Sequence, residues 1–134
     1  HKPYVAIWIE DDRKQVVSNL AVWYDGDMRK AEGEKWLKDM RQWWRRSGRS
    51  LDMPVDGVSG ATYGPGAYEL EFTSGKAPLA DLKPGEYRLR VEAAREVGGR
   101  ELINIPFSWP QSGEKTLEEQ GSSELGAIEL TIKP

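Results

Sequence analysis

The chain has 134 residues, which is enough for one domain with one hydrophobic core. It contains no cysteine, and this excludes disulfides, iron–sulfur clusters, thiolate zinc sites and a cysteine nucleophile. The single histidine, His1, argues against a histidine-based triad and against metal or haem sites with several histidines. A net charge of -3 argues against general nucleic-acid binding, because the phosphate backbone requires a basic face.

The charge is distributed unevenly along the chain. From Arg29 to Arg49 there are eight basic and three acidic residues, so this segment carries +5 and the remainder carries -8. A solvated helix face explains such a run, and a local anion site is the functional alternative. No apolar run has the length of a membrane span, so the chain is expected not to cross a membrane.

Two apolar runs near the N-terminus predict an antiparallel pair of strands. Tyr4–Ile9 is rich in β-branched and aromatic residues, and a second run, Val16–Tyr24, follows at hairpin distance. The residues Asp25, Gly26 and Asp27 then close the pair with turn chemistry.

The hydrophobic period next changes to that of a helix. We expect an amphipathic helix over about residues 33–47, because apolar side chains recur there at spacings of three and four residues. These side chains are Trp36, Leu37, Met40, Trp43 and Trp44. Such an aromatic stripe normally serves core packing.

The second half of the chain predicts strands again. Two of them alternate strictly between apolar and polar residues, as in sheets with one buried and one wet face. The expected strands are Tyr68–Phe72, Tyr87–Val91, Leu102–Trp109 and Ala127–Ile132, with a polar loop from Pro110 to Gly126. Short strands, turn signals and one inserted amphipathic helix predict a mainly β single domain over residues 1–134, an immunoglobulin-like β-sandwich.

The clearest chemical signal lies in a loop predicted over residues 54–66. This loop contains the pattern Asp-x-x-Ser-Gly-Ala-Thr, formed by Asp56, Ser59, Gly60, Ala61 and Thr62. The serine, glycine and alanine side chains are too small to build a core. An ordinary turn that leads into the next strand accounts for them, and so does a site that another molecule must approach closely.

This pattern is similar to the acceptor motif of substrates of bacterial FAD:protein FMN transferases, which attach FMN to proteins through a phosphoester on the last threonine. The resemblance implies that Thr62 is the acceptor, that Ser59, Gly60 and Ala61 precede it, and that Asp56 is the upstream acid. Small neighbours suit this chemistry, because a threonine hydroxyl that attacks a pyrophosphate must enter the active site of another enzyme.

Nearly the whole chain also resembles a family of predicted periplasmic bacterial domains of unknown function. The resemblance runs through Pro3–Asp11, the helix Trp36–Trp44, Val58–Thr62 and Pro84–Glu96. Members occur alongside membrane flavin and haem redox proteins, which implies a role in extracytoplasmic electron transfer. They usually carry a further strand before the first of these segments, so we expect this chain to be shorter or trimmed. Its start at histidine also fits removal of a signal peptide.

The first function that follows is that of a periplasmic redox carrier with FMN covalently bound at Thr62. Its partners would be a FAD:protein FMN transferase and a membrane or periplasmic redox protein. In this hypothesis Trp43, Trp44 or Tyr63 stacks on the isoalloxazine ring. The basic helix, with Arg45, balances the flavin phosphate or docks an anionic partner.

The second function is that of a non-catalytic protein- or glycan-binding module, with Trp8, Trp23 and Trp109 as candidate contact residues. A hydrolase is the weakest alternative. It would use the acids of Glu10–Asp12 or of Glu118–Glu119, but adjacent acids in turns are usually solvated surface.

Overall fold

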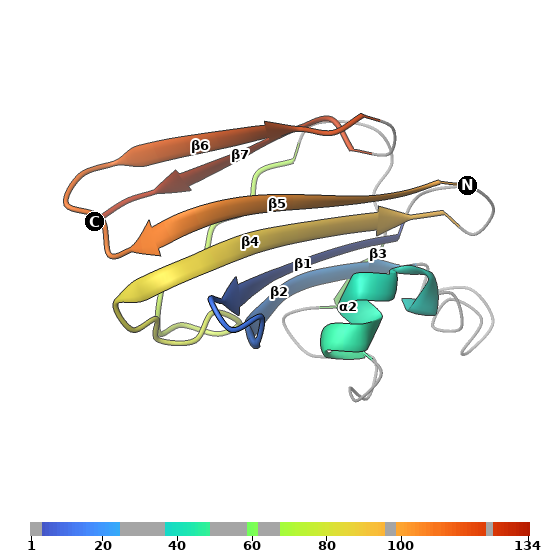
Figure 1. Cartoon of the computed structure of the whole chain (residues 1–134), viewed down its shortest axis with the longest axis horizontal. Helices are drawn as coiled ribbons and strands as arrows, with labels where there is room; N and C mark the ends of the chain where they lie inside the picture. The colour runs from blue at the N-terminus through green and yellow to red at the C-terminus, as the bar shows by residue number, and fades with distance from the viewer. Residues whose placement is uncertain (1–3, 25–36, 49–58, 62–67, 96–98, 123–124) are drawn as a thin grey trace.

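The computed structural model describes residues 4–24, 37–48, 59–61, 68–95, 99–122 and 125–134 (Figure 1). In this part of the chain the strands form a five-stranded sheet in the order β3-β2-β1-β4-β5 and a two-stranded sheet, β6-β7. The expected mainly β fold with one inserted helix is confirmed. The elements are β1 (Tyr4–Asp11), β2 (Val16–Tyr24), η1 (Leu37–Asp39), α2 (Arg41–Arg46), β3 (Ser59–Ala61), β4 (Gly85–Ala94), β5 (Arg100–Trp109), β6 (Lys115–Gln120) and β7 (Ala127–Ile132).

Strand β1 lies in the middle of the larger sheet, between β2 and β4. Most of its side chains are buried on both faces, which suits a run dominated by β-branched and aromatic residues. The hairpin to β2 turns at Asp11, whose Oδ1 accepts hydrogen bonds from the backbone N–H of Arg13 at 2.9 Å and of Gln15 at 3.0 Å. Lys14 adopts a left-handed φ of 65°, so this short turn closes with two hydrogen bonds to one side chain and one unusual backbone conformation.

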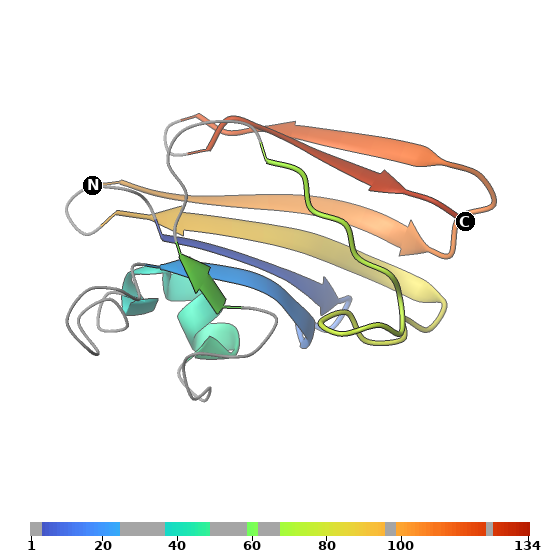
Figure 2. The same ribbon diagram turned by 180° about the vertical axis from the view of Figure 1, so that it is seen from behind.

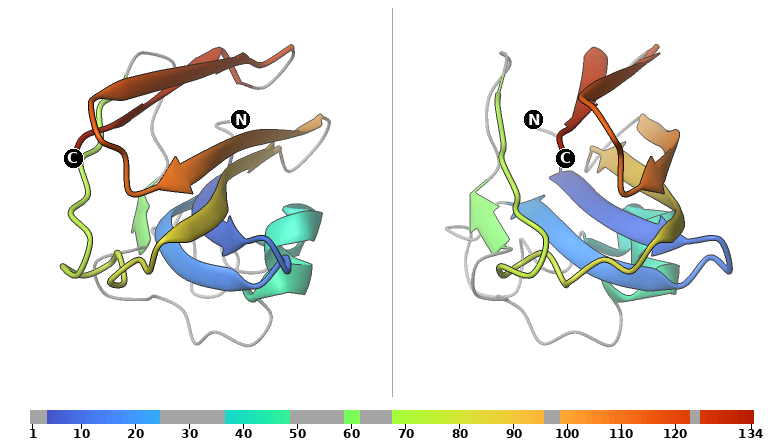
Figure 3. Two further views of the ribbon diagram at one scale, coloured as in Figure 1. Left: turned by 60° about the vertical axis from the view of Figure 1, so that its left-hand side comes forward. Right: turned by 90° about the vertical axis from the view of Figure 1, so that its left-hand side faces the viewer.

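One face of the larger sheet packs against β6 and β7 and forms the main core. Seen along the strands, the two sheets form two layers, and the segment 68–83 runs along one side of them (Figure 3). Within this core the rings of Tyr87 and Phe107 stack with centroids 5.8 Å apart. Its buried members are Val5, Ile9, Leu20, Leu79, Leu82, Tyr87, Leu89, Val91, Ala93, Ile103, Ile105, Phe107 and Ile132.

The opposite face of the larger sheet carries a second core, which η1 and α2 cover (Figures 1 and 2). Trp8 of β1 and Leu37, Met40 and Trp43 of the helical segment are all completely buried there. The sheet is therefore covered on both faces, and this explains why β1 reads as a nearly continuous apolar run rather than as an alternating one.

Two expectations about strands are wrong. Residues Tyr68–Phe72 form no strand, and Tyr68 and Leu70 are 49% and 43% exposed. The alternation of apolar and polar residues in this segment therefore does not correspond to a strand paired in a sheet. Conversely, the expected loop Pro110–Gly126 contains β6, which pairs with β7. The apolar pattern of β6 is weak because Leu117 is its only large apolar residue. Pairing with β7, rather than burial of its own side chains, stabilises this strand.

Within the described part of the expected helix 33–47, only Arg41–Arg46 are α-helical. The described part consists of η1 and the six-residue helix α2, while residues 33–36, with Trp36, lie outside the described residues. The turn expected at residues 25–27 also lies outside them. The predicted stripe is nevertheless the buried one, because Leu37, Met40 and Trp43 all face the sheet.

Candidate functional site

The first three small residues of the motif form β3, at one edge of the five-stranded sheet. This strand runs parallel to β2, with Val22 opposite Ser59, Trp23 opposite Gly60 and Tyr24 opposite Ala61. The loop expected over residues 54–66 is therefore wrong for residues 59–61. The local pattern could not show this, because Ser-Gly-Ala becomes a strand only through pairing with a distant partner.

The inserted helix explains how the chain returns to this edge. Two parallel neighbouring strands cannot be joined by a tight turn, so they need a crossover that passes over one face of the sheet. The chain between β2 and β3 contains η1 and α2, and both pack on one face of the sheet. The amphipathic segment is thus the crossover that delivers the motif to the edge beside β2 (Figure 2).

The proposed acceptor, Thr62, directly follows the last residue of β3. Thr62 itself, Tyr63 and Asp56 lie outside the described residues. In the described part of the chain β3 pairs with β2 alone, so the motif leads away from the border of the sheet rather than from its middle.

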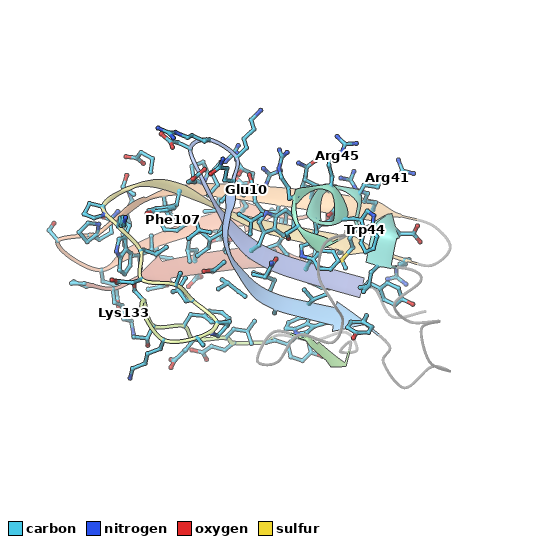
Figure 4. All side chains as sticks on the ribbon, turned by 90° about the horizontal axis from the view of Figure 1, so that it is seen from below. Glu10, Arg41, Trp44, Arg45, Phe107 and Lys133 are labelled. Carbon is cyan, nitrogen blue, oxygen red and sulfur yellow. The ribbon has the colours of Figure 1, made fainter. Side chains whose placement is uncertain are left out.

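The structure separates the two helix tryptophans that sequence analysis grouped together. Trp43 is fully buried, and its indole Nε1 donates a hydrogen bond of 2.9 Å to Oδ1 of Asn19. Its ring also lies against Gly48, with no space for a side chain there. Trp44 is only half-buried and is tilted against Trp43 with centroids 6.3 Å apart. Trp43 therefore serves the second core, whereas Trp44 and the exposed Arg45 lie towards the surface (Figure 4).

An aromatic pair beside the motif was not identified from the sequence. Trp23 is the ladder partner of Gly60, and its ring meets Tyr68 edge to face with centroids 6.2 Å apart. Tyr68 is about half exposed, at 49%. Trp23 and Tyr68 stand on either side of the motif in the sequence. Only the long-range pairing of β2 with β3 could have revealed that they meet.

A buried carboxylate organises the sheet face beside α2. Glu10 is completely buried, and its carboxylate contacts three guanidinium groups, those of Arg88 at 2.8 Å, Arg46 at 3.4 Å and Arg90 at 3.5 Å. Trp8 Nε1 donates a further hydrogen bond of 2.8 Å to it. Burial lowers the pKa of Arg90, and the positive charges of Arg88 and Arg46 also lower it, while Glu10 acts in the opposite direction.

A second buried carboxylate, that of Glu92, ties the helix to the sheet. It accepts hydrogen bonds from the backbone N–H of Gln42 at 3.1 Å and of Trp43 at 2.7 Å, which are early donors of α2 without helical partners. The same carboxylate is paired with Nε of Arg100 at 2.7 Å. Glu92 therefore does for α2 what a side-chain cap usually does, from a strand rather than from the preceding residue.

Five residues named for the binding-module and hydrolase alternatives are buried, partly buried or already bonded in this fold. Trp8 is completely buried, and Trp23 and Trp109 are partly buried against the main core. Glu10 is held by arginines, and Asp11 closes a turn. The described residues contain no group of three or more acids or histidines that could hold a metal ion.

Comparison with known proteins identifies the family. A family model described as "Predicted periplasmic protein (DUF2271)" matches residues 1–127. The chain therefore belongs to this family of periplasmic proteins, as its sequence led us to expect. No curated protein and no solved structure matches the chain. Within the described ranges, no helix has both the length and the apolar composition of a membrane span.

Proposed function

We propose that this protein is an extracytoplasmic electron-transfer domain that carries FMN through a phosphoester on Thr62. The observation that supports the proposal most directly is the position of the motif. Its small residues form the edge strand β3, and the chain reaches Thr62 directly after that strand. The periplasmic family fits a function outside the cytoplasm.

The attachment step requires a FAD:protein FMN transferase as partner. Oγ of Thr62 forms a bond to the phosphorus on the FMN side of FAD, the pyrophosphate bond breaks, and AMP leaves. The hydroxyl proton passes to a base of the transferase. A strand of Ser59, Gly60 and Ala61 before the acceptor presents little bulk to that enzyme, and β3 has no strand on its outer side among the described residues.

The residues around the motif suggest how the chain would hold the attached group. Tyr63 follows the acceptor, and Trp23 and Tyr68 form the nearest described aromatic pair to β3. Rings at this edge offer apolar faces and edges to a planar heterocycle. The half-buried Trp44 and the exposed Arg45 remain candidates on the crossover helix. Trp43 is completely buried, so we do not include its ring among the proposed flavin contacts.

When bound, FMN supplies the electron-transfer chemistry that the side chains of this protein cannot perform themselves. The role of the chain is to carry the attachment residue directly after the edge strand β3 in the sequence and to present it to two kinds of partner. The transferase meets the chain once, to attach FMN. A membrane or periplasmic redox protein meets it repeatedly, to exchange electrons.

The proposal is tested by exporting the chain to the periplasm of bacteria that also produce a FAD:protein FMN transferase there. We expect the purified chain to be yellow and to keep its flavin fluorescence after denaturation and gel electrophoresis. Thr62→Ala should abolish this fluorescence and leave the thermal unfolding curve unchanged. Thr73→Ala is the matched control, because it removes an exposed threonine hydroxyl elsewhere and should keep the label.

Two results would contradict the proposal. The first is a label of undiminished intensity on Thr62→Ala. The second is an unlabelled wild-type chain in cells where the same transferase labels an established substrate. Protein produced without the transferase is colourless in either case, so the coexpressed sample is the informative one.

A further inference from the structure

Six arginines of the described residues gather on the sheet face that carries α2. Arg41 and Arg45 are exposed on the helix and point outward (Figure 4). Arg46, also from the helix, reaches Glu10 together with two arginines of β4. We call this set the arginine face. It consists of Arg41, Arg45, Arg46, Arg88, Arg90 and Arg100.

The carboxylates that the structure describes on this side of the sheet do not balance these charges. Glu10 and Glu92 are completely buried and already bonded. Glu86, which lies on the same side of β4, is bonded to Ser108, and Asp39 of η1 is half-buried. Among the described residues, the six arginines thus face four carboxylates, and two of those four are hidden from solvent. The described part of this face is therefore positive, although the whole chain carries -3.

Two arginines of β4 also keep unused hydrogen-bond donors. Nε of Arg88 and Nε of Arg90 are buried and have no hydrogen-bond partner among the described residues. Three guanidinium groups share the single carboxylate of Glu10, and the side chain of Arg90 is only 10% exposed. Positive charge that is partly withdrawn from water and only partly paired is costly, so an additional anion at this face is favourable.

The spacing of these arginines favours several carboxylates over one small anion. Arg88, Arg90 and Ala94 lie on the same side of β4, and Arg100 pairs with Ala94 across the ladder. At about 3.3 Å per residue, the six-residue step from Arg88 to Ala94 corresponds to a row of about 20 Å. Guanidinium groups bind planar carboxylates in a bidentate manner, which suits an extended acidic segment of a protein.

The row ends at the same end of the sheet as the motif strand β3, although on the opposite edge. Gly60, Trp23, Val5, Ala93 and Glu101 are successive ladder partners across all five strands. Arg100 precedes the last of these residues, and Thr62 follows the first by two positions. Four strand spacings of about 4.8 Å separate β5 from β3, or about 19 Å. A protein bound along this row of arginines would therefore extend to the end of the sheet at which β3 ends.

We infer that the arginine face is the docking surface for the acidic segment of a redox partner protein. This inference rests on the proposed electron-transfer function, because repeated exchange of electrons needs a partner that arrives quickly and leaves again. Complementary charge accelerates such encounters and makes them sensitive to salt. The arginines therefore act by steering and orienting the partner.

Calorimetric titration with poly-L-glutamate, used as an acidic polypeptide probe, tests the surface. It is carried out on the Thr62→Ala chain, which has no flavin attachment residue, so its outcome is independent of the proposed modification. Arg88→Gln/Arg100→Gln should weaken binding at low salt about tenfold, the loss expected for two partly exposed charge pairs. Because Arg88 also pairs with Glu10 and Arg100 with Glu92, we include Arg41→Gln/Arg45→Gln, which removes two exposed charges outside both pairs and should weaken binding by a similar factor.

The matched control is Lys115→Gln/Lys133→Gln, which changes the net charge equally at the first residue of β6 and just after β7, and should alter binding less than about twofold. An equal loss in the lysine variant, or no binding of the probe by the parent chain at low salt, overturns the inference. So does tighter, arginine-dependent binding to phosphatidylglycerol vesicles than to poly-L-glutamate, because the occupant would then be a membrane surface.

Discussion

Replacing Gly48 by alanine measures how firmly the helix is packed on the sheet. A Cβ atom at this position would lie 2.5–2.8 Å from three carbons of the Trp43 ring. The ring is fully buried and is also fixed by its bond to Asn19, so it has little room to move. Overpacking of this kind costs about 1–3 kcal/mol, and a rigid ring places the cost in the upper half of that range.

An opposing effect reduces this cost slightly. Alanine restricts the unfolded chain more than glycine does, which stabilises the folded state by about 0.4–1 kcal/mol. We therefore expect Gly48→Ala to lower the free energy of unfolding by about 2 kcal/mol. Urea unfolding followed by tryptophan fluorescence gives this value directly. Gly113→Ala is the control, because nothing lies within 4 Å of its added Cβ. A Gly48→Ala protein as stable as the parent would refute the assignment of Trp43 to the core.

Three further predictions concern the helix cap, the second sheet and the motif edge. Glu92→Gln should cost about 2 kcal/mol and should speed amide exchange in α2 more than in β4, because a neutral amide replaces a carboxylate that accepts two helix donors. Gly121→Ala should destabilise the chain in urea by about 2 kcal/mol, since its Cβ would meet the backbone carbonyl of Leu125, whereas Gly126→Ala should have little effect. In the flavin-bearing chain, Tyr68→Ala should make the flavin fluorescence more accessible to quenching by iodide, and unchanged quenching would remove Tyr68 from the site.

The strands that could be predicted from sequence are those whose own side chains build a core. β1 and β2 consist largely of β-branched and aromatic residues that are buried in the sheet, and the apolar alternation of β5 matches its burial. In contrast, β6 is mostly exposed and β3 has only small residues, so both depend on pairing with another strand. Patterns within a segment carry no information about such partners.

The candidate site divides in the same way. The spacing of the motif and the apolar stripe of Leu37, Met40 and Trp43 are local features, and both could be read from the chain. The contact between Trp23 and Tyr68 depends on a parallel crossover, and the arginines around Glu10 come from two elements, α2 and β4, that are far apart in the sequence. Neither could have been found by inspecting neighbouring residues.

The most direct test of the whole account is the fragmentation mass spectrum of the chain purified after coexpression with the transferase. We expect one adduct per chain, with the mass of FMN less one water, on the peptide that contains the Ser-Gly-Ala-Thr sequence, and fragment ions that assign it to Thr62. An adduct assigned to any other residue, or an unmodified peptide beside a fully modified control substrate, would contradict the proposed function.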